Sequence, residues 1–143
     1  MRFVLDASVT LSWLLRNAAA RDEAYPFAVL NALRDPDTLA MVPMTWGLEV
    51  ANVIARSEAK ELLTAAQSGS FISLLEEISM EVDADTFTHV LSDTLQLSRR
   101  YRLSSYDASY LELALRNGSP IATLDDDLRR AANKAGVKTF KPT

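Results

Sequence analysis

Short apolar runs alternate along the chain with longer segments in which apolar residues recur every three or four positions. The short runs predict buried strands, with the third at a sheet edge, and they occupy residues 3–5, 39–43, 79–82, 120–124 and 137–140. The longer segments predict amphipathic helices, over residues 8–15, 22–34, 45–59, 64–78, 85–101, 105–116 and 126–135. This alternation favours an α/β fold with a parallel sheet and helices on both of its faces.

The clearest helical pattern lies in residues 85–101. The apolar residues expected on its buried face are Phe87, Val90, Leu91, Leu95 and Leu97. Asn117 and Gly118 are typical of a helix end, and they follow the helix predicted over 105–116.

Composition narrows the class of protein. The chain of 143 residues has the length of one domain, and no repeat or long linker divides it, so we expect residues 1–143 to form a single domain. Cysteine is absent, which excludes thiolate catalysis, thiolate zinc sites and disulfides. No apolar stretch reaches the ~18 residues typical of a membrane span, and Asp6 interrupts the first run too early for a signal peptide. We therefore expect a cytoplasmic protein.

The net charge of −4 is mild evidence against a nucleic-acid binder, which usually carries a basic face. A local patch matters more than the total charge. The densest basic stretch is residues 99–102, and Arg56 and Lys60 form a second strip on one helical face. On its own, each of these two basic stretches is interpreted as solvated surface.

Two acidic residues come directly after predicted strands. Asp6 follows the first strand and Asp125 follows the fourth. In parallel sheets the ligand-binding crevice lies beyond the carboxyl ends of the strands, where both residues would project. Asp107 lies in the first turn of its helix, and Glu49 lies inside another helix on the face shared with Asn52. We predict that the four carboxylates meet at this edge.

Carboxylates that meet in this way repel one another, and a divalent cation removes the repulsion. Oxygen ligands without cysteine or a suitable histidine favour Mg²⁺ or Mn²⁺ over zinc. Such a site suits phosphodiester hydrolysis, because the metal polarises a phosphate oxygen, lowers the pKa of a bound water and stabilises the leaving oxygen. The sequence leaves open whether one ion binds or two.

Each acid also has an ordinary structural interpretation. Asp6 and Asp125 are placed to cap the helices that follow them. Asp107 stands three residues after Ser104, the spacing of a capping box, and Glu49 fits a helix surface. For any one residue alone the structural role is favoured, and only the joint pattern indicates a site.

Four segments resemble the PIN-domain family, and within it the VapC-like ribonuclease toxins. They read VLDASV at 4–9, EVANV at 49–53, SYDASY at 105–110 and ATLDDDL at 122–128. They follow the family's order and span the chain from its first strand almost to its last. The resemblance implies a three-layer α/β/α sandwich with a parallel central sheet, a Mg²⁺ or Mn²⁺ site and endonucleolytic cleavage of RNA. It also implies a homodimer and a cognate antitoxin of a type II toxin–antitoxin system, inserting a peptide near the active site.

The resemblance carries over residue by residue. The family's acidic positions, catalytic and metal-binding, are matched by Asp6, Glu49, Asp107 and Asp125. Its supporting positions are matched by Ser8, Asn52 and Thr123. Because Asp126 and Asp127 adjoin Asp125, the choice of ligand among the three stays open. We favour Asp125 and interpret the other two as first-turn acids stabilised by the helix dipole.

Two other functions compete. A phospho-receiver signalling domain also holds Mg²⁺ at a sheet edge, and Lys141-Pro142 resembles its Lys-Pro pair, but Asp6 is followed by Ala7-Ser8 rather than a second acid. Asp83 is also a poor phosphoacceptor candidate. The second alternative is a non-catalytic PIN-like module that binds RNA or protein, which the presence of all four acids disfavours. We interpret His89 as a surface residue, and Trp13 and Trp46 as core or interface residues.

Overall fold

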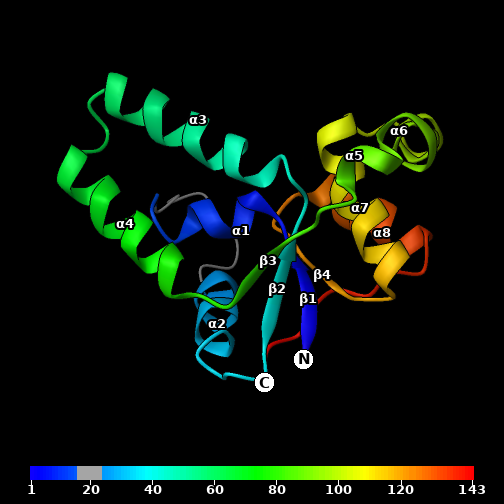
Figure 1. Cartoon of the computed structure of the whole chain (residues 1–143), viewed down its shortest axis with the longest axis horizontal. Coiled ribbons are helices and arrows are strands. Elements are labelled where there is room, and N and C mark those ends of the chain that lie inside the picture. Colours follow the sequence, from blue (N-terminus) through cyan, green and yellow to red (C-terminus); the bar gives the residue numbers. More distant parts are fainter. Residues whose placement is uncertain (16–23) are drawn as a thin grey trace.

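A parallel four-stranded sheet forms the centre of the computed structural model, which describes residues 1–15 and 24–143 (Figure 1). The strands are β1 (Arg2–Leu5), β2 (Leu39–Val42), β3 (Met80–Val82) and β4 (Ile121–Ala122). Their order is β3-β2-β1-β4, and every neighbouring pair is parallel. The predicted parallel sheet is confirmed, and β3 lies at an edge as expected.

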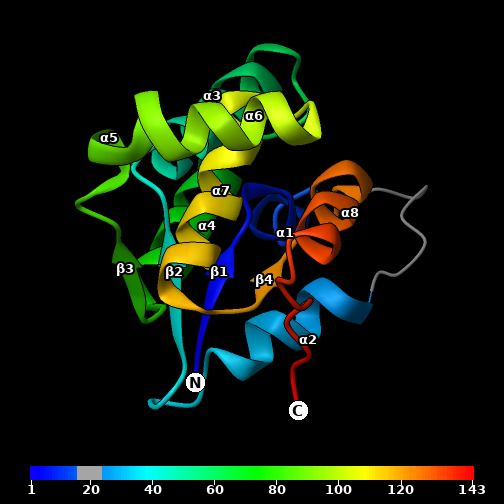
Figure 2. The same ribbon diagram turned by 90° about the vertical axis from the view of Figure 1, so that its right-hand side faces the viewer.

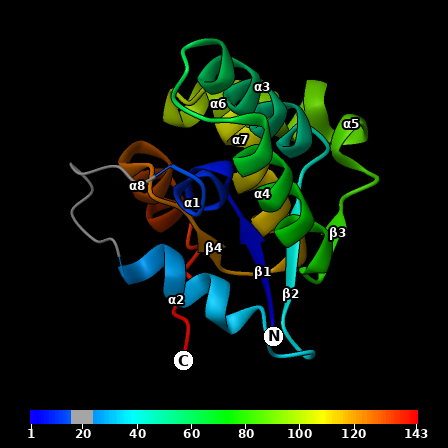
Figure 3. The same ribbon diagram turned by 90° about the vertical axis from the view of Figure 1, so that its left-hand side faces the viewer.

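Helices cover both sides of the sheet. The first group is α1 (Ala7–Ser12), α2 (Ala24–Ala32), α3 (Trp46–Ala59) and α4 (Ala65–Glu77). The second is α5 (Thr86–His89), the π-helical turn η1 (Val90–Thr94), α6 (Leu95–Tyr101), α7 (Ser105–Asn117) and α8 (Asp126–Lys134). Figure 1 shows α1 to α4 on one side of the strands and α5 to α8 on the other. Figure 2 looks onto the second group and Figure 3 onto the first, and the predicted three-layer α/β/α architecture is confirmed.

Strand β1 is buried on both faces, as its uninterrupted apolar sequence predicts for a central parallel strand. Val4 packs in the larger core cluster, with residues of α3, α4, α7 and α8. Phe3 and Leu5 point to the opposite face and pack in a smaller cluster with residues of α1 and α2. The Phe3 ring stacks on Phe140 with 3.9 Å between centroids. Because this strand is fixed from both sides, the residue that follows it is held firmly in place.

Both tryptophans pack against the core, as predicted. Trp13 donates its indole N–H to the Pro26 carbonyl (2.7 Å), and Trp46 donates to the Thr10 hydroxyl (3.1 Å). Each ring therefore contributes apolar packing, while its indole N–H has a hydrogen-bond acceptor. No helix among the described residues is both long enough and apolar enough to cross a membrane.

Two predicted elements differ from the structure. Residues 85–101 form α5, η1 and α6 rather than one helix, and Phe87 and Leu91 of the predicted buried face are 78% and 81% exposed. Phe87 lies before the π turn, in α5, where Thr86 is the buried residue. The wider turn then adds a residue, which rotates the following face by roughly 100°, and Thr94 is buried within the turn. Residues 137–140 make a single bridge, Thr139 to Ile121, because β4 is only two residues long and offers little edge to pair with.

The other predicted boundaries agree with the structure to within three residues. The predicted start of the second helix, at residue 22, lies outside the described residues.

Candidate functional site

Asp6 directly follows β1 at the carboxyl edge of the sheet, and it is 4% exposed. Its Oδ2 accepts hydrogen bonds from the hydroxyls of Ser8 (2.6 Å) and Thr123 (2.7 Å). Although Asp6 occupies the N-cap position of α1, its side chain makes no capping hydrogen bond there. The ordinary interpretation of this residue as a helix cap is therefore wrong, because the carboxylate bonds the Ser8 and Thr123 hydroxyls instead of the helix amides.

The same two hydroxyls join the segment after β1 to the segment after β4. The Ser8 hydroxyl accepts a hydrogen bond from the Leu124 amide (3.0 Å), and the Thr123 hydroxyl accepts one from the Asp125 amide (3.0 Å). Backbone bonding continues the link, since the Asp6 amide donates to the Ala122 carbonyl (3.0 Å). Asp6 and Asp125 are therefore fixed beside each other by a network that both predicted hydroxyl residues supply.

Asp125 does cap its helix. Its Oδ1 accepts a hydrogen bond from the Leu128 amide (2.9 Å) at the start of α8. Asp126 and Asp127 are both exposed and form ion pairs one turn along α8, with Arg129 and Arg130 respectively. Among the three adjacent acids, Asp125 alone is partly buried and near Asp6 in the network.

Glu49 reaches the site from α3 and is partly buried. Its Oε1 accepts a hydrogen bond from the Tyr110 hydroxyl (3.0 Å), and Tyr110 itself is fully buried in α7. Asp107 lies in the first turn of the same helix, where Ser104 caps its amide (3.1 Å). Asn52 is exposed on α3, and its side chain makes no hydrogen bond to the described residues.

The pKa values of three of the acids show that the carboxylates lie within reach of one another's charge. The pKa of Glu49 is raised to about 7, chiefly by burial and to a smaller extent by the charges of Asp6 and Asp107. Burial and the charges of Asp125 and Asp6 raise the pKa of Asp107 to about 6. The pKa of Asp6 is raised chiefly by burial, and the charge of Asp125 adds to it although the two hydroxyls oppose it. The structure thus places the four predicted acids within range of one another's charge, although among the described residues no three of them have oxygens within 4.8 Å of one another.

This donor set fits a divalent cation. It is made of carboxylate oxygens, and both the burial and the mutual repulsion that raise these pKa values disfavour negative charge that a cation would balance.

A family model described as PIN domain matches residues 3–134, nearly the whole chain. The chain belongs to the PIN-domain family. Ribonuclease VapC3 from Pyrobaculum aerophilum is 28% identical over 128 residues, which cover 90% of this chain and 92% of that protein.

Two solved structures are similar to this PIN domain. PAE2754 from Pyrobaculum aerophilum has a TM-score of 0.64 at 19% identity, covering 92% of this chain and 79% of its own. FitAcB from Neisseria gonorrhoeae has a TM-score of 0.62 at 17% identity, covering 99% and 98%. At such identities these likenesses support the fold. Family membership overturns the phospho-receiver alternative.

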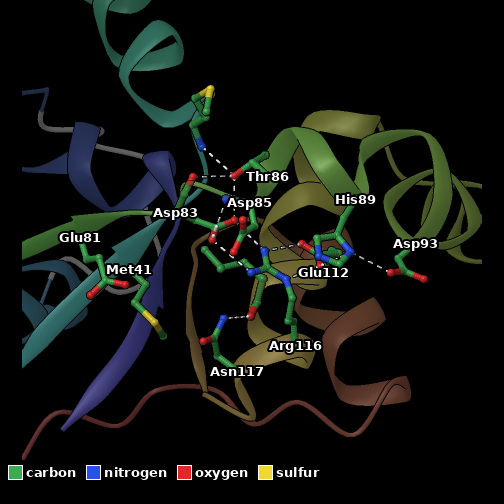
Figure 4. Close-up of polar contacts among 12 residues, drawn as sticks. Met41, Glu81, Asp83, Asp85, Thr86, His89, Asp93, Glu112, Arg116 and Asn117 are labelled. Atoms are coloured by element: carbon green, nitrogen blue, oxygen red, sulfur yellow. Dashed lines mark hydrogen bonds and ion pairs between the residues drawn. The ribbon is translucent and has the colours of Figure 1, made fainter.

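A second polar cluster of this PIN domain joins the end of α5 and the η1 turn to α7 (Figure 4). Here one atom each of His89, Asp93 and Glu112 lies within 4.8 Å of the others, the one such group in the described part of the chain. The Arg116 guanidinium already bonds both oxygens of Glu112 (2.7 and 3.1 Å). Because that positive charge occupies the carboxylate, this cluster fits a cation less well than the four acids do, although those are spaced more widely.

Sequence reasoning missed two residues that these clusters depend on. Tyr110 stands three residues after Asp107, so it shares a helical face with that acid, and this spacing was the available signal. His89, interpreted as a surface residue, instead has a largely covered side chain that contacts Asp93 at 3.0 Å and Glu112 at 3.6 Å. No local pattern connects His89 with Glu112, because they lie on different helices.

Proposed function

We propose that this PIN domain is a metal-dependent endoribonuclease and the toxin of a toxin–antitoxin pair. The observation that carries the proposal is the convergence of Asp6, Glu49, Asp107 and Asp125 from four separate elements, with raised pKa values on three of them. Similarity to Ribonuclease VapC3 supports RNA as the substrate.

We assign the metal-binding role to the same four carboxylates, with Mg²⁺ or Mn²⁺ as the ion. Such an ion supplies charge that stabilises a phosphate undergoing attack and lowers the pKa of water. Ser8 and Thr123 orient the Asp6 carboxylate, and Tyr110 orients that of Glu49. Because the pKa of Glu49 is about 7 without the ion, binding of the cation near neutral pH would displace a proton from Glu49 and hold its carboxylate ionised.

We further propose a cytoplasmic homodimer that is inhibited by a cognate antitoxin. Several large apolar side chains outside the core support a protein partner. They are Leu48, Leu62, Phe87 and Leu91, which are 74%, 66%, 78% and 81% exposed.

Hydrolysis of a labelled single-stranded RNA tests the proposed activity. We expect the purified protein to cut the RNA internally in the presence of Mn²⁺ and to lose this activity in EDTA, because the acids alone repel the phosphate. Re-addition of Mn²⁺ in excess should restore cleavage. Binding of RNA without any cleavage in Mn²⁺ would favour the non-catalytic PIN-like module instead.

The rate of cleavage should rise with pH through about 6 to 7, the pKa values of Asp107 and Glu49 in the metal-free protein. Protons compete with the cation for these carboxylates, so the ion binds more tightly as the pH rises. The Tyr110 hydroxyl lowers the pKa of Glu49, so Tyr110→Phe should raise that pKa further and move the rising limb of the profile to higher pH. The measurement is the pH dependence of kcat/KM at a fixed Mn²⁺ concentration well below saturation, where the rate follows the occupancy of the metal site.

Tyr25→Phe is the matched control for this prediction. It removes a hydroxyl that donates to the Phe140 carbonyl (2.8 Å) rather than to a carboxylate, so its profile should follow that of the wild type. A Tyr110→Phe profile that coincides with the wild type would show that this hydrogen bond does not tune Glu49.

A further inference from the structure

Four basic side chains line one cavity of about 390 Å³ between the end of α6 and α8. Its walls are Arg100, Tyr101, Arg102, Asp127, Arg130, Ala131 and Lys134. The first three of these belong to the basic stretch that the sequence alone indicated to be ordinary solvated surface. The fold instead gathers that stretch with two further cations from a segment some thirty residues later.

The cavity has an excess of positive charge. Arg130 forms an ion pair with Asp127, the single acid of the lining, so these two charges cancel. Within residues 1–15 and 24–143, neither Arg100, Arg102 nor Lys134 has a carboxylate partner. The Arg100 guanidinium lies 5.6 Å from the centre of the Tyr101 ring, which helps to hold it in place. Unpaired cations gathered in this way attract an anion.

The chain connects this cavity directly to the four acids. Helix α6 is followed within a few residues by the first turn of α7, which holds Asp107, and α8 begins immediately after Asp125. Asp127, in the cavity wall, is close enough for its charge to raise the pKa of Asp107. Figure 2 shows α6 and α8 on the same face of the molecule as α7. The basic cavity therefore adjoins the acidic site.

We infer that this cavity binds the phosphodiester backbone of the RNA strand next to the bond that is cut. The inference rests on the proposed function and adds the residues that position its substrate. A protein with a net charge of −4 and an acidic site repels RNA, so binding needs a local cationic surface. Guanidinium groups match the geometry of phosphate oxygens, and two of the unpaired cations here are arginines. Arg100, Arg102 and Lys134 are positioning residues, since they would contact the strand outside the reacting phosphate.

The test is the binding of a fluorescent single-stranded RNA in EDTA at several salt concentrations. The parent protein and all variants compared in this test carry Asp6→Asn, so that RNA cleavage does not interfere with the binding measurement. The double variant Arg100→Gln/Lys134→Gln should weaken RNA binding about tenfold and reduce the slope of log affinity against log salt by about 1.4, or roughly 0.7 for each lost phosphate contact.

The matched control is Lys138→Gln/Lys141→Gln. It removes the same number of charges from another cavity, which is lined by Met1 and Arg2 at the opposite end of β1. We expect its RNA affinity to stay within about twofold of the parent protein. Melting curves of both double variants show whether each remains folded. Equal losses in the two variants would overturn the inference, since they would report net charge alone.

Two further outcomes would also overturn the inference. One is unchanged RNA binding by Arg100→Gln/Lys134→Gln. The other is binding of a polyglutamate peptide that is as strong as RNA binding and is weakened as much by Arg100→Gln/Lys134→Gln. That result would assign the cavity to an acidic protein segment. Cleavage by the wild-type chain in Mn²⁺ is measured separately. If the wild type cuts RNA but the cavity substitutions leave RNA binding unchanged, only the role of the cavity is contradicted. If the substitutions weaken RNA binding but the wild type does not cut RNA, only the proposed nuclease activity is contradicted.

Discussion

Asp6→Asn should abolish RNA cleavage, lowering kcat/KM on the order of 10³-fold or more, without disrupting the fold. The amide has nearly the shape of the carboxylate, and its oxygen can still accept the hydrogen bonds from Ser8 and Thr123. What it lacks is the negative charge that would bind the cation. Because burial makes that charge costly in the metal-free protein, the variant should melt no lower than the wild type in EDTA, and slightly higher if repulsion from Asp125 is relieved.

Asp126→Asn provides the matched control for Asp6→Asn. It removes the same charge from an exposed acid that pairs with Arg129, so cleavage should stay close to the wild-type rate. Steady-state cleavage in Mn²⁺ and melting curves with and without the ion measure both effects. Mn²⁺ should raise the melting temperature of the wild type and of Asp126→Asn, and much less that of Asp6→Asn. Wild-type cleavage by Asp6→Asn would remove this residue from the site.

The location of the acids could be predicted because it follows from topology. A carboxylate directly after a parallel strand must lie at the carboxyl edge of the sheet, and this rule places Asp6 and Asp125 from the order of residues alone. The position of Glu49 inside a helix follows no such rule. Its approach depends on how α3 packs, and on the hydrogen bond from Tyr110, which lies sixty-one residues further along the chain.

Features that depend on packing between distant segments could not be predicted in the same way. The π turn at Val90–Thr94 changes which side chains face the core, and the apolar pattern of residues 85–101 gives no sign of it. The basic cavity likewise needs α6 and α8 to lie side by side before Arg102 and Lys134 can share it. Charge density along the sequence is a poor guide to charge density in space.

Arg116→Met should lower the free energy of unfolding by about 3 kcal/mol, which corresponds to a fall in melting temperature of roughly 10 °C for a chain of this size. Figure 4 shows the guanidinium between two carboxylates, Glu112 on its own helix and Asp83 just after β3. It bonds both oxygens of each, with the shortest contacts at 2.7 Å to Glu112 and 2.6 Å to Asp83. Glu112 is only 4% exposed, so the substitution would leave a buried charge without its partner.

A rescue variant separates this cause from simple loss of packing. Arg116→Met/Glu112→Gln removes the cation together with the more buried of its two carboxylates and leaves only Asp83 unpaired. It should recover part of the lost stability, because replacing a buried pair costs far less than breaking it. Arg2→Met is the control for an exposed pair. Arg2 and Glu81 are both more than half exposed, so its loss should cost less than about 1 kcal/mol. A double variant no more stable than Arg116→Met would refute the charge explanation.

The dependence of this effect on pH gives an independent check. Hydrogen bonding from Arg116 lowers the pKa of Asp83 below its ordinary value of 3.8. A carboxylate whose pKa is lowered by folding stabilises the fold above the unfolded pKa, and this contribution disappears as the pH falls through the folded one. The stability difference between wild type and Arg116→Met should therefore be full at neutral pH and should shrink below about pH 4, as measured by urea unfolding at each pH. A gap that stayed constant into acid would mean that the side chain of Arg116 stabilises the fold by packing rather than by its charge.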